Sequence, residues 1–170
     1  FREGTRERKS AAACGLLEQV FGWARETGAQ QPLTAGVWEY GPDHVPVANE
    51  FNTIALAMSD IVSFHCYMPE TALRGVITSL AAHGRPLLCT EWLARSEGSV
   101  AALLPVFREL NVGAINWGLV DGRTQTRFPW RSWTEKVTDD EPWFHELLHR
   151  DGTPYDPEEA SLFRSVSPVR

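Results

Sequence analysis

Short apolar segments recur along the chain at near-regular intervals. Four of them are bounded by polar or turn-forming residues: Leu33–Trp38, Ile61–Tyr67, Leu87–Trp92 and Gly113–Trp117. Their first residues are 28, 26 and 26 positions apart, which leaves room each time for a helix and two loops. The pattern therefore predicts four strands in repeated βα units.

The stretches around these strands place apolar residues at three- and four-residue spacing, which is typical of amphipathic helices. Gly84 favours a helix end just before it, and Ser96 is a candidate N-cap for the helix that follows the third strand. The helices that we expect are Ala11–Glu26, Asn49–Met58, Thr71–His83, Ser99–Leu110 and Glu158–Arg164.

Strand–helix alternation with apolar strands predicts an α/β fold with a parallel sheet. The chain has no glycine-rich phosphate loop, which argues against a doubly wound nucleotide-binding fold. A TIM barrel needs about 250 residues and eight strands, so four strands predict the second half of a (β/α)8 barrel. The start at Phe1, which is not a Met, fits a cut inside a longer protein. The alternative is a small domain with an open four-stranded sheet.

We expect a single domain over 1–170. Within it, 1–30 holds the leading helix, 31–118 the βα units, 119–140 a long loop and 141–170 the terminal helices. The 43% of hydrophobic residues is enough to bury a core, while a net charge of −6 without a basic run argues against nucleic acid. No apolar stretch approaches the roughly 20 residues that span a bilayer, so we expect no membrane partner.

The cysteines form no metal-binding or disulfide pattern. Cys14, Cys66 and Cys89 are odd in number and lack CxxC spacing, so we interpret them as small buried hydrophobic residues. Unpaired thiols favour a reducing compartment, but the sequence leaves export and the cytoplasm both open.

Polar and aromatic side chains gather where the predicted strands end, the place where parallel α/β folds carry their chemistry. Alternation places His65 and Tyr67 on one face, and Glu91 closes an otherwise apolar row that begins at Leu87. A carboxylate there is costly unless it is paired or faces a cleft. Trp117 offers a flat apolar surface for a sugar ring. Together these residues predict a carbohydrate-binding cleft.

Three tripeptides at the strand ends, in this order, resemble those of the second half of a cellulase-like, clan A, family 5-like glycoside hydrolase barrel. They are His65-Cys66-Tyr67, Thr90-Glu91-Trp92 and Asn116-Trp117-Gly118. The segments Gly118–Trp130 and Trp143–Glu159 also resemble bacterial proteins of the cellulase family. The resemblance covers nearly the whole chain.

The resemblance implies retaining hydrolysis of β-linked glycans. It assigns Glu91 as the nucleophile, Tyr67 as the residue that orients it, His65 as a polar substrate contact and Trp117 as the stacking platform. Further residues expected to contact substrate are Trp38, Glu39, Trp92 and Gln125.

The acid/base of this family is the Glu of an Asn-Glu pair that ends the fourth barrel strand. The one such pair here, Asn49-Glu50, lies in a helical pattern, so we expect the acid/base upstream of Phe1 and the chain alone to be nearly inactive. The expected partners are therefore an oligo- or polysaccharide and the missing N-terminal half of the barrel. Glu39 is the best internal substitute for the second carboxylate.

We expect no cofactor and no metal. His65, Cys66, Cys89 and Glu91 lie on neighbouring predicted strands, but alternation turns His65 and Cys66 to opposite faces.

Less specific interpretations remain open for these residues. The structural interpretation of Glu91 is a strand-end carboxylate paired with Arg95 or Arg123, and that of Trp117 is a core residue. The loop Gly118–Glu141 either shapes substrate specificity or packs its tryptophans against the outer helices. The alternative for the whole chain is a non-catalytic carbohydrate-binding or scaffold barrel fragment.

Overall fold

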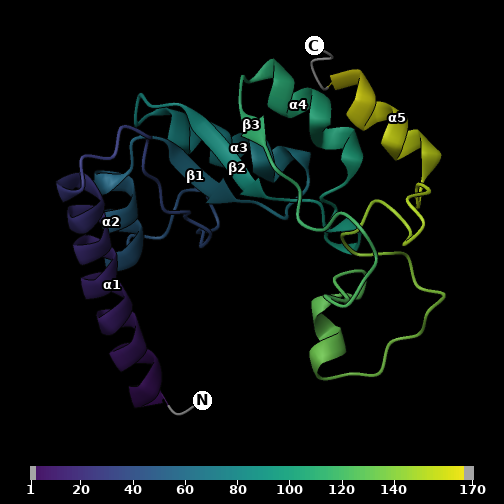
Figure 1. The fold of residues 1–170 in the computed structure, drawn as a ribbon, viewed down its shortest axis with the longest axis horizontal. Coiled ribbons are helices and arrows are strands. Elements are labelled where there is room, and N and C mark those ends of the chain that lie inside the picture. Colours follow the sequence, from purple (N-terminus) through teal and green to yellow (C-terminus); the bar gives the residue numbers. More distant parts are fainter. Residues whose placement is uncertain (1–2, 167–170) are drawn as a thin grey trace.

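The computed structural model describes residues 3–166, so Phe1, Arg2 and the last four residues lie outside it (Figure 1). Within that range the chain forms a three-stranded parallel sheet and five α-helices. The strands are β1 (Val62–His65), β2 (Leu87–Glu91) and β3 (Gly113–Ala114). The α-helices are α1 (Glu3–Glu26), α2 (Glu50–Met58), α3 (Glu70–Ala81), α4 (Leu104–Glu109) and α5 (Pro157–Val166). Short 3-10 helices span Arg95–Glu97, Ala101–Leu103 and Trp130–Trp133.

The sheet has the order β1-β2-β3, with Val62 opposite Leu87 and Leu88 opposite Gly113. Its strands carry side chains such as Phe64 and Cys89 into one core, which the apolar stripes of α3 and α4 complete. In Figure 1 the sheet lies between α1 and α2 on one side and α4 and α5 on the other. The α/β class and the parallel pairing are as predicted.

The first predicted strand, Leu33–Trp38, is wrong as a strand. Only Val37 pairs with β1, through its own N–H to Ser63 and through the N–H that His65 donates to the Val37 carbonyl. Before Val37, backbone N–H groups donate hydrogen bonds to side chains instead of to the backbone of a neighbouring strand. The Leu33 N–H donates to the Asp60 carboxylate at 2.8 Å. A sheet of three strands therefore replaces the predicted four.

The helix predicted over Ser99–Leu110 is divided in two. It begins as the 3-10 turn Ala101–Leu103 and becomes α4 at Leu104. Pro105 lies in the first turn of α4 and has no N–H to donate to an upstream carbonyl, which explains the division. Ser96 is not its N-cap, because it belongs to a separate 3-10 turn that ends at Gly98 with a positive φ of 83°.

The other predicted helices are present with shifted ends. Asn49 caps α2 by accepting a hydrogen bond from the Asn52 N–H, and Gly84 follows α3 with a φ of 66°. The leading helix starts at Glu3, well before the expected Ala11. Of the terminal helices expected in 141–170, only α5 is found in the described part of that range.

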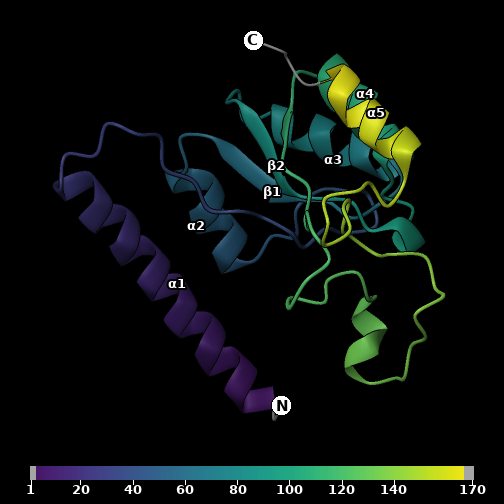
Figure 2. The same ribbon diagram turned by 45° about the vertical axis from the view of Figure 1, so that its right-hand side comes forward.

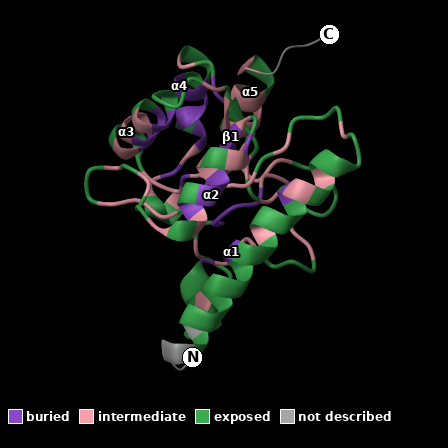
Figure 3. Ribbon diagram, turned by 90° about the vertical axis from the view of Figure 1, so that its left-hand side faces the viewer, coloured by how far each residue is buried: buried purple, intermediate pink, exposed green. Residues whose placement is uncertain are grey.

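α1 packs one face against α2 and leaves the rest exposed. Cys14 and Phe21 are buried, whereas Leu16, Val20 and Trp23 on the opposite side are exposed. Figure 3 shows this mainly exposed helix running diagonally beside α2. None of the helices within 3–166 is long and apolar enough to cross a membrane.

The segment after β3 forms a lobe of loops next to the carboxyl ends of the strands, drawn green to yellow in Figure 2. Its regular structure before α5 is the 3-10 turn Trp130–Trp133. Two backbone bridges close it, Val120 with Leu148 and Leu148 with Pro154. This lobe brings residues far along the sequence next to β1 and β2.

Candidate functional site

A β-bulge positions the carboxylate at the end of β2. Phe64 pairs with Cys89, but His65, the next residue of β1, pairs with Glu91, so Thr90 is the extra residue. The Cys66 N–H donates to the Glu91 carbonyl at 2.9 Å and fixes this shifted register. Bulges re-aim side chains. This one sets Glu91 opposite His65, which simple alternation along the strand does not require.

The carboxylate of Glu91 is held through one of its two oxygens. The Tyr67 hydroxyl donates a hydrogen bond of 2.8 Å to Oε2. Nδ1 of His65 lies 3.3 Å from the same oxygen. Among the described residues, no group donates a hydrogen bond to Oε1. Because the side chain of Glu91 is 24% exposed, this second oxygen remains available to a bound molecule.

Both partners of Glu91 are held in their neutral forms. Burial raises the pKa of the Tyr67 phenol, and the hydrogen bond to Glu91 raises it further. Burial lowers the pKa of His65, although the charge of Glu91 opposes that shift. The His65 ring lies against Gly36, where a Cβ atom would be only 3.0 Å from Nε2. Tyr67 is therefore a hydroxyl donor at physiological pH, and His65 is an uncharged imidazole.

Two cavities meet at Glu91. The first has a volume of about 630 Å³ and is lined by Trp38, Tyr40, His65, Cys66, Tyr67, Met68, Glu91 and Trp130. The second has a volume of about 310 Å³ and is lined by Tyr67, Glu91, Trp117, Thr124, Gln125, Thr126, Phe128, Trp130, Ser132, Trp133 and His145. Glu91, Tyr67 and Trp130 line both, so the carboxylate faces a cleft with an aromatic wall on either side.

Most of the predicted site residues come together in this cleft. His65, Tyr67, Glu91 and Trp38 line the first cavity, and Trp117 and Gln125 line the second. The functional roles given to them stay predictions.

Two predicted residues lie elsewhere. Glu39 lines a separate cavity beside α1 and α2, where it accepts a hydrogen bond of 3.0 Å from Asn49. Trp92 is a correction: it is fully buried, with its ring centroid 5.1 Å from that of Phe107 and 5.9 Å from that of Phe163. It is a core residue, because the backbone that turns Glu91 toward the cleft turns Trp92 into the interior.

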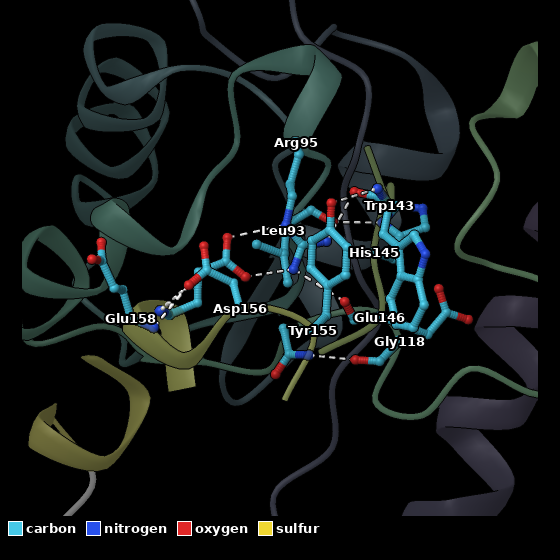
Figure 4. A network of polar contacts seen from close by, with 11 residues as sticks. Leu93, Arg95, Gly118, Trp143, His145, Glu146, Tyr155, Asp156 and Glu158 are labelled. Carbon is cyan, nitrogen blue, oxygen red and sulfur yellow. Dashed lines mark hydrogen bonds and ion pairs between the residues drawn. The ribbon is translucent and has the colours of Figure 1, made fainter. Parts of the chain in front are cut away.

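The arginines proposed as partners of Glu91 do not pair with it in the described range. Arg95 instead forms an ion pair of 2.5 Å with Glu159 and donates to the carbonyls of Trp143 and Glu146. Its guanidinium also lies 4.9 Å from the centre of the Tyr155 ring. Figure 4 shows this polar network. It fastens the segment that carries His145 to the start of α5.

His145 is a site residue that the sequence analysis missed. The residue is 2% exposed, its ring lies 5.5 Å from the Tyr67 ring, and it lines the second cavity. The Trp130 ring meets Tyr67 edge-on at 5.1 Å and Phe144 at 4.9 Å. The aromatic cluster Trp143-Phe144-His145 was the available signal, but its distance along the sequence from Glu91 concealed their proximity.

Within residues 3–166, no group of three or more His, Cys, Asp or Glu side chains is arranged to hold a metal ion.

No protein-family model matches the chain, and no curated protein matches it. Among solved structures, that of an agarase, AgWH50C, is similar with a TM-score of 0.42 and 16% sequence identity. The matched region covers 71% of this chain and 20% of the agarase chain, so this chain spans about a fifth of that protein's length. A likeness at this level is distant and leaves the function to be argued from the site itself.

Proposed function

We propose that this chain is part of a retaining glycoside hydrolase that acts on β-linked glycans, with Glu91 as its nucleophile. One observation carries the proposal. Glu91 ends a parallel strand, is held through Oε2 by Tyr67 and His65, and keeps Oε1 without a partner in an aromatic cleft. A nucleophilic carboxylate needs this combination, because one oxygen must be fixed while the other attacks.

The proposed reaction has two displacements. Oε1 of Glu91 attacks the anomeric carbon, the bond to the glycosidic oxygen breaks, and an acid gives that oxygen a proton. Water then attacks the same carbon, loses a proton to the former acid and releases Glu91. Tyr67, a neutral donor to Oε2, keeps the attacking oxygen oriented without competing for it.

The second carboxylate of the mechanism is proposed to come from outside the described residues. Retaining enzymes place the two carboxyl groups about 5 to 5.5 Å apart. Among residues 3–166, Glu91 is the one carboxylate that lines either cavity, and Glu39 lines a separate one. We therefore propose that the acid/base belongs to an upstream segment, and that β1, β2 and β3 are part of the second half of a (β/α)8 barrel completed by it.

The cleft walls fit a neutral sugar chain. Trp38 and Trp117 are 56% and 43% exposed and lie in the first and second cavities, on either side of Glu91. Exposed indole rings stack on the apolar faces of pyranose rings because both surfaces are flat and partly desolvated. We propose that Trp117 is such a platform and that the loop Gly118–Glu141 selects among glycans through residues such as Gln125.

A single-turnover assay tests the proposal. The chain is mixed with 2,4-dinitrophenyl β-glucoside, β-xyloside and β-mannoside, whose leaving group departs without a proton and so needs no acid. We expect release of dinitrophenolate from at least one of them, and a loss of at least about a thousandfold in Glu91→Gln. Glu39→Gln is the matched control and should release it at the wild-type rate. Equal rates in wild type and Glu91→Gln would refute the assignment.

The second candidate is a non-catalytic carbohydrate-binding chain. It is favoured by the presence of one carboxylate, Glu91, in the two cavities formed by the described residues. Under this alternative the wild-type chain binds oligosaccharides but releases no dinitrophenolate, and Glu91→Gln binds them equally well.

A further inference from the structure

His145 is fixed in one tautomer by a buried contact. Its Nδ1 lies 2.5 Å from the carbonyl oxygen of Leu93. A carbonyl oxygen can only accept a hydrogen bond, so Nδ1 must carry the proton. Burial lowers the pKa of the imidazole, although the bond to Leu93 opposes that shift, so the ring is neutral. A neutral ring protonated on Nδ1 has a bare lone pair on Nε2.

No side chain or backbone group among residues 3–166 donates a hydrogen bond to Nε2. The ring cannot readily turn to find one, because Phe144 lies 4.2 Å and Tyr67 5.5 Å from its centroid. Yet His145 lines the second cavity, next to Glu91 and Trp117. An acceptor that lines a cavity and receives no hydrogen bond from the chain is available to a hydroxyl donor bound in that cavity.

The backbone around His145 is tightly packed, and this packing holds the imidazole in place. At Gly118, which has a φ of 81°, a Cβ atom would lie 2.9 Å from Cβ of His145 and 3.1 Å from the Glu146 backbone nitrogen. The Arg95 guanidinium donates to the carbonyls of Trp143 and Glu146 on either side of it. The imidazole is therefore placed by contacts from three directions.

We infer that His145 is a substrate-binding residue whose Nε2 accepts a hydrogen bond from a hydroxyl of a sugar unit in the second cavity. The inference rests on the proposed function and adds to it a residue that selects for a hydroxyl at one ring position. The sugar unit that it contacts is the one that stacks on Trp117, next to the glycosidic bond that is cleaved.

The matched variant is His145→Asn. The Asn amide nitrogen reproduces the Nδ1 donor to Leu93, while the Nε2 acceptor is removed. The 170-residue chain is titrated with cellotetraose, xylotetraose and mannotetraose, and tryptophan fluorescence reports the dissociation constant. We expect the tetrasaccharide bound by wild type to bind His145→Asn roughly three- to tenfold more weakly, with an unchanged melting temperature.

A measurement on the wild-type chain covers the case in which the variant does not fold. Long-range proton–nitrogen NMR identifies the tautomer of His145 and follows Nε2 as the tetrasaccharide is added. We expect a bare Nε2 whose resonance moves upfield on binding, a change that a purely structural histidine would not show.

The outcomes separate the two proposals. Tight binding by His145→Asn, or an Nε2 resonance that stays in place at saturation, overturns the role of His145 and leaves the proposed function standing. Failure of the wild-type chain to bind any of the three tetrasaccharides overturns the proposed function, and the role of His145 with it.

Discussion

Tyr67, two residues beyond the end of β1, and Glu91, the last residue of β2, are joined by a hydrogen bond of 2.8 Å from the phenol to Oε2. Because the bulge at Thr90 moves Glu91 opposite His65, the same oxygen also lies within 3.3 Å of an imidazole nitrogen. The hydrogen bond from Tyr67, with the imidazole beside the same oxygen, gives the carboxylate an orientation, and that orientation is the basis of the nucleophile assignment.

Removing the phenol hydroxyl should weaken the attack without unfolding the chain. A hydrogen bond to a charged group contributes about 1.5–3 kcal/mol, so Tyr67→Phe should slow dinitrophenolate release by roughly ten- to a hundredfold. Tyr155→Phe is the control, because its hydroxyl contacts the Trp143 backbone, away from Glu91. A Tyr67→Phe rate equal to that of wild type would show that the bond does not orient the carboxylate.

Arg95 should be the most important charged residue for stability. It is 11% exposed, and its removal leaves the Glu159 carboxylate and two carbonyls without their donor. We expect Arg95→Met to lower the free energy of unfolding by about 2–4 kcal/mol in urea titrations. Arg74→Met removes an exposed pair with Glu109 and should cost less than about 1 kcal/mol. If both variants lost the same free energy of unfolding, the buried contacts of Arg95 would not be more important for stability than the exposed pair of Arg74.

Two histidines whose pKa values are lowered by burial should make stability fall in acid. The pKa values of His65 and His145 are both lowered by burial from the ordinary value of 6.5. Below about pH 6.5 the unfolded chain therefore binds more protons than the folded one, and stability drops as the pH falls. We expect the melting temperature to decrease between about pH 7.5 and 5.5. The decrease should be smaller in His65→Gln/His145→Asn and unchanged in a variant of the exposed His83. A double variant with the full wild-type decrease would exclude these two groups as its cause.

The thiols of Cys66, which follows β1, and of Cys89 in β2 should be unreactive in the folded chain. Cys66 and Cys89 are 2% and 0% exposed, and burial raises the pKa of Cys66 to about 11. The thiolate is the nucleophile, so a disulfide reagent at about pH 8 should leave both unmodified until denaturant is added. Peptide mass spectrometry locates the label. Rapid labelling of Cys66 in the native chain would contradict this expectation and would mean that the reagent reaches Cys66 through the first cavity.

The sequence pattern predicted the elements whose formation is decided locally. Helical spacing predicts α3 because its apolar stripe is continuous, and alternation predicts that His65 and Tyr67 share a face. It overestimates Leu33–Trp38, because the choice between a ladder and the Asp60 carboxylate is made by a residue distant in sequence. The prediction that Trp92 contacts substrate failed for a related reason: the indole packs between α4 and α5.

The parts of the site that the sequence pattern missed depend on tertiary structure. The bulge at Thr90 is a property of the pairing with β1 and leaves no mark in the spacing of β2. His145 reaches Tyr67 only because the lobe of loops folds back over the strand ends, where the Arg95 contacts hold it. Neither feature has a periodic signal, so neither could be read from a single sequence.

The most direct test of the central claim is the location of a covalent sugar on the chain. The chain is incubated with the 2-fluoro analogue of whichever dinitrophenyl β-glycoside reacts. The fluorine substituent slows hydrolysis of the glycosyl intermediate, so the labelled peptide can be identified by mass spectrometry. Our account predicts one sugar, attached to Glu91 and absent from Glu91→Gln. A sugar attached to Glu39 or another residue, or a chain that reacts without ever carrying a sugar, would contradict it.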